Sequence, residues 1–143
     1  MGIRLLKIAV IYMQIGVAAG LVMGVLHQFQ YSPVHAHIGL LGWASLALAG
    51  LIYHFYPEAA QTRLAKVHFW LHNLGLPVFM LGLFLLISGS ALAEPFVRVG
   101  AVTTFAGLLM FTINVLRTVR LATAPNTTTP APREFAAHLG EWK

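Results

Sequence analysis

The sequence has 143 residues, of which 58% are hydrophobic, only 9% are charged and none is cysteine. A soluble domain usually carries about 25% charged residues, so this composition excludes an ordinary soluble globular protein. The absence of cysteine excludes disulfides, thiolate metal sites and iron–sulfur clusters.

The predicted fold is all-α, with four transmembrane helices at residues 5–26, 34–56, 67–92 and 96–116. Each apolar segment has about 20 residues or more, enough to cross about 30 Å of hydrocarbon. Proline marks the boundaries, because Pro33 precedes the second segment, Pro57 ends it and Pro95 opens the fourth. The first segment is longer than the apolar core of a typical signal peptide, so we expect it to be retained.

Most basic residues flank one end of each apolar segment, at Arg4, Lys7, Arg63, Lys66, Arg117 and Arg120. The positive-inside rule then places both termini and the middle connection in the cytoplasm. This topology accounts for the net charge of +5 without any nucleic-acid partner. We expect a transmembrane domain at residues 1–121 and a flexible cytoplasmic tail, rich in Thr and Pro, at 122–143.

Six of the seven histidines lie inside or beside the predicted spans, at His27, His35, His37, His54, His68 and His72. Ionisable side chains in a bilayer are costly, so a group of this size predicts a function. The first three are expected toward the outer face and the last three toward the inner face. The heights of His35 and His54 differ by roughly 28 Å along the helix, so one metal ion cannot join the two groups.

The outer group contains His35 and His37, which are two residues apart. On an α-helix such residues point about 200° away from each other, so they cannot chelate one ion, but they can serve two sites on opposite sides of the helix. The face below His35 continues with the small and apolar residues Gly39, Gly42, Leu46 and Ala49. This groove admits either a neighbouring helix or a flat cofactor.

The inner group contains His68 and His72, whose i, i+4 spacing lets them face one metal ion. The nearby Lys66 and Trp70 are typical of a membrane interface, so solvated histidines are an equal alternative. Without thiolates, imidazole is the good metal ligand that remains, and it suits haem iron, copper and zinc. An apolar, Gly-lined site favours haem, and since no Cys-x-x-Cys-His motif is present, we expect a non-covalent haem b.

Two runs of sequence resemble subunit I of haem–copper oxidases and nitric oxide reductases: residues 35–43, HAHIGLLGW, and residues 53–57, YHFYP. The whole chain resembles the small stand-alone cytochrome c oxidase subunit I-like membrane proteins of bacteria, and residues 68–77, HFWLHNLGLP, are typical of that group. The resemblance implies a multi-pass protein of the bacterial inner membrane. In subunit I, twelve helices form three similar arcs of four, so one chain has the length of one arc, and a homotrimer could rebuild the ring.

The resemblance also implies roles for His35 and His37, which match a His-x-His pair that serves two haems. We expect a haem at each subunit interface, with His35 of one chain and His37 of the next as axial ligands. In a simpler form of this hypothesis, one histidine ligates the haem iron and the other side of the haem is open to a gas. The oxidases bind copper through adjacent histidines, whereas His68 and His72 are four apart, and the oxidases' active-site tyrosine and acidic proton-path residues have no counterpart here. Terminal oxidase activity and proton pumping are therefore not expected.

The function expected from these residues is haem binding for electron transfer, with a respiratory electron donor, or for binding NO, CO or O2. One alternative is an enzyme that reduces NO or O2 with copper beside the haem. Another is a non-catalytic accessory subunit of a respiratory complex. A copper-handling role through His68 and His72 is a further possibility.

Overall fold

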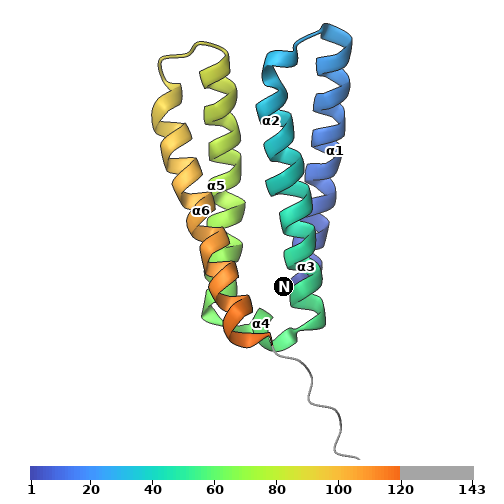
Figure 1. Ribbon diagram of the computed structural model, residues 1–143, viewed down its shortest axis with the longest axis vertical. Helices are drawn as coiled ribbons and strands as arrows, with labels where there is room; N and C mark the ends of the chain where they lie inside the picture. The colour runs from blue at the N-terminus through green and yellow to red at the C-terminus, as the bar shows by residue number, and fades with distance from the viewer. Residues whose placement is uncertain (120–143) are drawn as a thin grey trace, which may run out of the picture.

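The computed structural model describes residues 1–119, and they form a bundle of long helices (Figure 1). The elements in chain order are α1 (Gly2–Leu26), η1 (Phe29–Tyr31), α2 (Ser32–His37), η2 (Ile38–Ser45), α3 (Leu46–Phe55), α4 (Pro57–Gln61), α5 (Arg63–Ile87) and α6 (Ala93–Thr118). Since η1, α2, η2 and α3 follow one another in a continuous rod, the chain has four helices long and apolar enough to span a membrane. The prediction of an all-α fold with four membrane-spanning helices is confirmed. The predicted tail at 122–143 lies outside the described residues.

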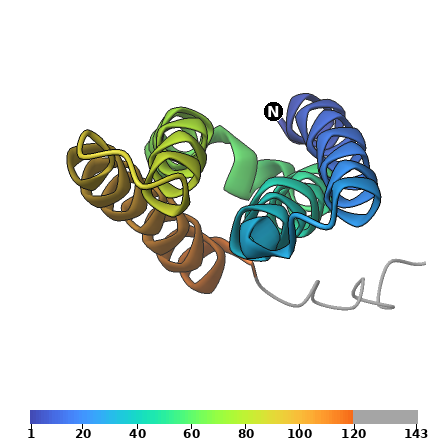
Figure 2. The same cartoon turned by 90° about the horizontal axis from the view of Figure 1, so that it is seen from above.

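The helices are arranged as two hairpins, which Figures 1 and 2 show side by side. The rod formed by α2, η2 and α3 packs on α1, and α6 packs on α5 along its length. The short helix α4 joins the two hairpins at the end where α1 begins. Glycines let the two helices of the second hairpin, α5 and α6, approach each other closely. A Cβ placed on Gly100 would lie 2.2 Å from the backbone nitrogen of Phe79, and one on Gly82 would lie 2.4 Å from the backbone nitrogen of Val97.

Beyond shifts of a few residues at the other span ends, two details of the spans differ from the sequence prediction. The third span was expected to reach residue 92, but α5 ends at Ile87, because the chain turns at Gly89 with a φ of 76°. Glycine adopts this left-handed conformation without the steric cost that other residues incur. The second span contains a π-helical segment, η2, that the sequence did not predict. Its hydrogen-bond spacing is one residue wider than in an α-helix, and the Ser45 hydroxyl donates to the Leu40 carbonyl at 2.8 Å within it.

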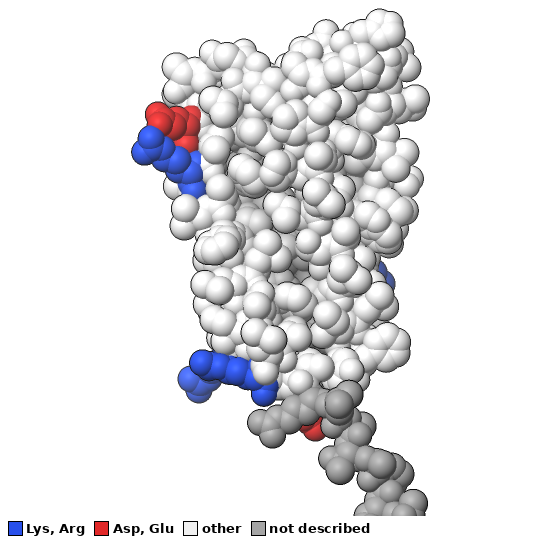
Figure 3. Space-filling view, in the orientation of Figure 1, with Lys and Arg blue, Asp and Glu red and all other residues white. Residues whose placement is uncertain are grey.

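The outer surface of the bundle is that of a lipid-facing protein. Large apolar side chains such as Leu21, Val25, Leu74 and Val102 are more than half exposed. In Figure 3 the charged side chains lie mostly toward the two ends of the visible face, with an uncharged surface between them. A surface of this kind is stable only in a bilayer, so we describe the chain as a multi-pass membrane protein.

Candidate cofactor site

His35 lies on α2 and faces α1 of the same chain. Its Nδ1 donates a hydrogen bond to the Gly16 carbonyl at 3.0 Å, and its ring lies against Gly20, where a Cβ would come within 3.0 Å of Cε1. In a neutral imidazole this bond leaves the lone pair on Nε2. Metal-ligating histidines are usually held in this way, with the second nitrogen donating to a carbonyl. His35 is therefore oriented as a ligand would be.

His37 lies on the other side of α2 and faces α5. Its ring meets Phe79 edge-on, with ring centroids 5.2 Å apart, and its Nδ1 donates to the Pro33 carbonyl at 2.7 Å. The two histidines thus contact different neighbouring helices, as their spacing along α2 requires. Each has Nδ1 tied to a backbone carbonyl, which leaves Nε2 of both rings with the ligand lone pair.

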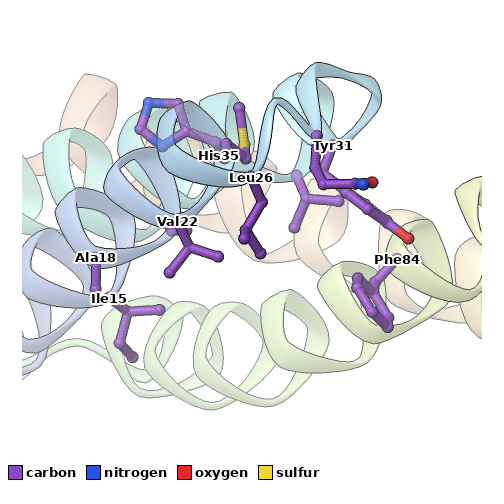
Figure 4. Close-up of a pocket in the computed structure, with 11 residues that line it drawn as sticks. Ile15, Ala18, Val22, Leu26, Tyr31, His35 and Phe84 are labelled. Carbon is purple, nitrogen blue, oxygen red and sulfur yellow. The ribbon is translucent and has the colours of Figure 1, made fainter.

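An apolar cavity of about 610 Å³ lies beside His35. Its walls come from α1, through Ile15, Ala18, Val22 and Leu26 among others, and from Phe84 of α5 on the opposite side (Figure 4). His35 lies at its edge and is the one histidine in its lining among the described residues. Cofactor sites in proteins are apolar hollows of about 300–1,000 Å³ with a few polar groups, so size and chemistry both suit a large apolar cofactor.

The small residues of the predicted groove have different surroundings. Tyr12 of α1 covers Gly42, where a Cβ would meet its ring at 2.6 Å. Gly39 has nothing within 4 Å of the place where a Cβ would be. Leu46 and Ala49 are buried in a cluster with Leu5 and Ala9 of α1. Below Gly39 the groove therefore packs a helix of the same chain, and only its upper end is open.

His68 and His72 are fully buried in the bundle, which contradicts the interpretation of solvated interfacial histidines. Their rings meet edge-on, with centroids 5.5 Å apart and ring planes at 77°. His72 Nε2 donates to the Leu41 carbonyl at 3.0 Å, so this pair reaches the middle of the second span. Helix α6 packs closely here, because a Cβ on Gly107 would lie 2.8 Å from the backbone nitrogen of His72, and Phe111 of α6 lies with its ring centroid 5.0 Å from that of His68.

The second nitrogen of each ring, His68 Nε2 and His72 Nδ1, is buried without a hydrogen-bond partner in the described structure. Buried polar atoms rarely lack a hydrogen-bond partner, and the usual partner of such an atom is a water molecule or a metal ion. However, residues 1–119 contain no group of three or more His, Cys, Asp or Glu side chains placed to hold a metal. Two nitrogens alone are fewer than the three or four protein ligands of typical zinc sites.

A buried polar network that the sequence analysis did not foresee surrounds His68. Its Nδ1 lies 3.3 Å from the Tyr53 hydroxyl, which also accepts from Asn114 Nδ2 at 3.4 Å. Asn114 donates to the Ala59 carbonyl at 2.9 Å and accepts from the Thr62 hydroxyl at 2.8 Å. The network connects α3, α4, α5 and α6. The available signal was Asn114 itself, a lone amide in the fourth apolar segment.

Replacing Asn114 by leucine should destabilise the bundle by about 1–3 kcal/mol, because the Tyr53 hydroxyl, the Ala59 carbonyl and the Thr62 hydroxyl each lose one hydrogen bond. Thr112→Ala is the matched control on the same helix, since the exposed Thr112 hydroxyl bonds only to the Leu108 carbonyl of its own helix. Unfolding of both variants with increasing SDS in mixed micelles measures the difference. Equal midpoints for the two variants would remove the stabilising role of the network.

A distant sequence similarity relates the chain to a known oxidase subunit. The chain matches no protein-family model and no solved structure. The Cbb3-type cytochrome c oxidase subunit CcoN1 of Stutzerimonas stutzeri is 25% identical over an alignment of 145 positions, gaps included, which covers 79% of this chain. This similarity supports a distant relation to subunit I of the haem–copper oxidases. The alignment covers 29% of the length of CcoN1, so the chain spans less than a third of this relative.

Proposed function

We propose that the protein binds haem b in the membrane through His35 and His37, for electron transfer or for binding a small gas. One observation carries the proposal: His35 is held by the Gly16 carbonyl at the edge of the apolar 610 Å³ cavity, with the lone pair left on Nε2. When bound, the haem would supply an iron that changes oxidation state or binds a gas. The chain would bury the macrocycle against α1 and orient the imidazole.

His37 would ligate a second haem, and the next chain of a homotrimer would supply the other ligand of that haem. Two observations support this arrangement. His35 and His37 contact different neighbours, α1 and α5, so they can serve separate haems. The chain also covers 29% of its relative, close to the third that one arc of four helices would represent. We further propose that both termini face the cytoplasm of a bacterium, because Arg4, Arg63 and Lys66 gather at one end of the helices.

The spectrum of the reduced protein with and without CO tests this proposal. A haem with His35 and a partner's His37 has no free coordination position, so CO should leave the reduced spectrum unchanged, as expected for electron transfer. A haem held by His35 alone should bind CO and shift the Soret band, as expected for a gas-binding protein. A purified protein without any haem absorbance contradicts both forms and favours the accessory subunit.

The second candidate is an enzyme that reduces NO or O2 with copper held by His68 and His72. The two partnerless nitrogens favour it, although further ligands would have to come from outside the described residues. Metal analysis of the purified protein should find about one copper per haem if this candidate holds. The copper should disappear in His68→Ala, whereas His54→Ala, with an exposed ring, should retain it. Copper-free protein removes the candidate and leaves haem binding unaffected.

A further inference from the structure

A second cavity, of about 690 Å³, lies at the end of the bundle where α1 and α5 begin. It is remote from His35, and its walls come from three elements. Arg4 belongs to α1, Gln61 to α4, and Lys66, Phe69 and Trp70 to α5. The hollow thus combines two cationic groups and an amide with an aromatic wall.

Arg4 and Lys66 bring two positive charges to this hollow, and neither forms an ion pair with an acidic residue within the described part of the chain. Within residues 1–119 the one ion pair joins Arg98 to Glu94, near the start of α6 at the other end of the bundle. The acidic residue at this end is Glu58, which makes no ion pair with the described basic residues. Two unneutralised cations facing one cavity create a local positive potential, and its complement is an anion.

The aromatic wall indicates which anion fits. Trp70 is 61% exposed next to Phe69, and exposed tryptophan is typical of the level of lipid headgroups. The cavity beside His35 also has one wall on α1 and one on α5, beginning at Ile15. From Arg4 to Ile15 is about 16 Å along the helix, roughly half of the 30 Å hydrocarbon thickness. An acyl chain that starts at the cations would therefore run along apolar surface between α1 and α5.

We propose that this hollow binds the headgroup of an anionic phospholipid. Its phosphate lies between Arg4 and Lys66, the Gln61 amide donates to it, and an acyl chain packs on Phe69 and Trp70. Basic pockets between transmembrane helices recognise anionic headgroups by this combination of charge and apolar contact. The headgroup site is separate from the proposed haem site, since none of the described histidines lines this cavity.

Native mass spectrometry of the delipidated full chain tests the proposal with two added lipids of identical acyl chains, phosphatidylglycerol and phosphatidylcholine. The wild type should retain phosphatidylglycerol preferentially. Arg4→Gln with Lys66→Gln should weaken its binding about thirtyfold, from about 1 kcal/mol for each basic residue. Arg63→Gln is the matched control, because Arg63 lies at the same end of α5 but does not line the cavity.

Three results would overturn the proposal. The wild type could retain both lipids equally, which would leave no role for headgroup charge. Arg63→Gln could lose as much phosphatidylglycerol as the double variant, which would reduce the effect to general surface charge. Inorganic phosphate at millimolar concentration could displace the lipid completely, which would make the hollow a site for free phosphate. Equal thermal midpoints of all variants ensure that the comparison reports binding.

Discussion

His35→Ala is expected to lose haem, with a collapse of the Soret band in the purified protein. Among the histidines of residues 1–119, His35 is the one that lines the apolar cavity, and alanine leaves no imidazole ligand atom there. Even changes to groups that only orient a metal ligand cost about 10–100-fold in affinity, so removing the ligand should cost more than about tenfold. Absorbance at the Soret maximum, normalised to protein concentration after size-exclusion chromatography, measures the loss.

Two further variants separate ligation from general damage. His54→Ala removes an exposed imidazole at the other end of the bundle and should keep the full Soret band. Gly20→Val keeps His35 but crowds its ring, since even a Cβ on Gly20 lies 3.0 Å from Cε1, and it should shift or weaken the band. A full Soret band in His35→Ala would remove His35 as the ligand. Loss of the band in His54→Ala as well would show that the assay reports folding.

Gly100→Ala is expected to cause the largest loss of stability of any single methyl group added to the bundle. The new Cβ would lie 2.2 Å from the nitrogen and 2.4 Å from the Cα of Phe79, and backbone atoms in a packed helix cannot move aside as a flexible side chain can. Overpacking usually costs about 1–3 kcal/mol, and here the whole contact between α5 and α6 must open. The thermal midpoint in detergent should fall by several degrees.

Gly24→Ala provides the control for the same substitution. Gly24 lies on α1 with nothing within 4 Å of the added Cβ, and alanine is the better helix former by about 1 kcal/mol. Its midpoint should stay the same or rise. If Gly100→Ala and Gly24→Ala have the same thermal midpoint, α5 and α6 are further apart than the structure places them.

Much of the fold was predictable because hydrophobic length is a strong signal. The four spans follow from apolar runs long enough for a bilayer, and prolines such as Pro33 and Pro57 mark their ends. The placement of His35 and His37 against different helices followed from helical periodicity alone. The distant relation to subunit I, indicated by residues 35–43 and 53–57, agrees with the similarity to CcoN1.

Other features could not be predicted because they depend on contacts between segments, and the periodicity of one segment carries no information about its neighbours. His68 and His72 lie near Lys66 and Trp70 in sequence and therefore suggested an interface. However, both are buried, because Phe111 of α6 lies against the His68 ring and the His72 ring bonds to the Leu41 carbonyl of η2. Gly42 suggested a cofactor groove, but Tyr12 of α1 fills the space. The π-helical turn of η2 has no local sequence signal here, because its residues would also form an ordinary α-helix.

The most direct test of the account is the haem content of the wild-type protein, purified in detergent from cells supplied with haem precursor. The pyridine haemochrome assay identifies the haem type and, with the protein concentration, its stoichiometry. Coordination through His35 and His37 predicts haem b at close to one per chain. A colourless, well-folded protein that fails to take up added haem would contradict it.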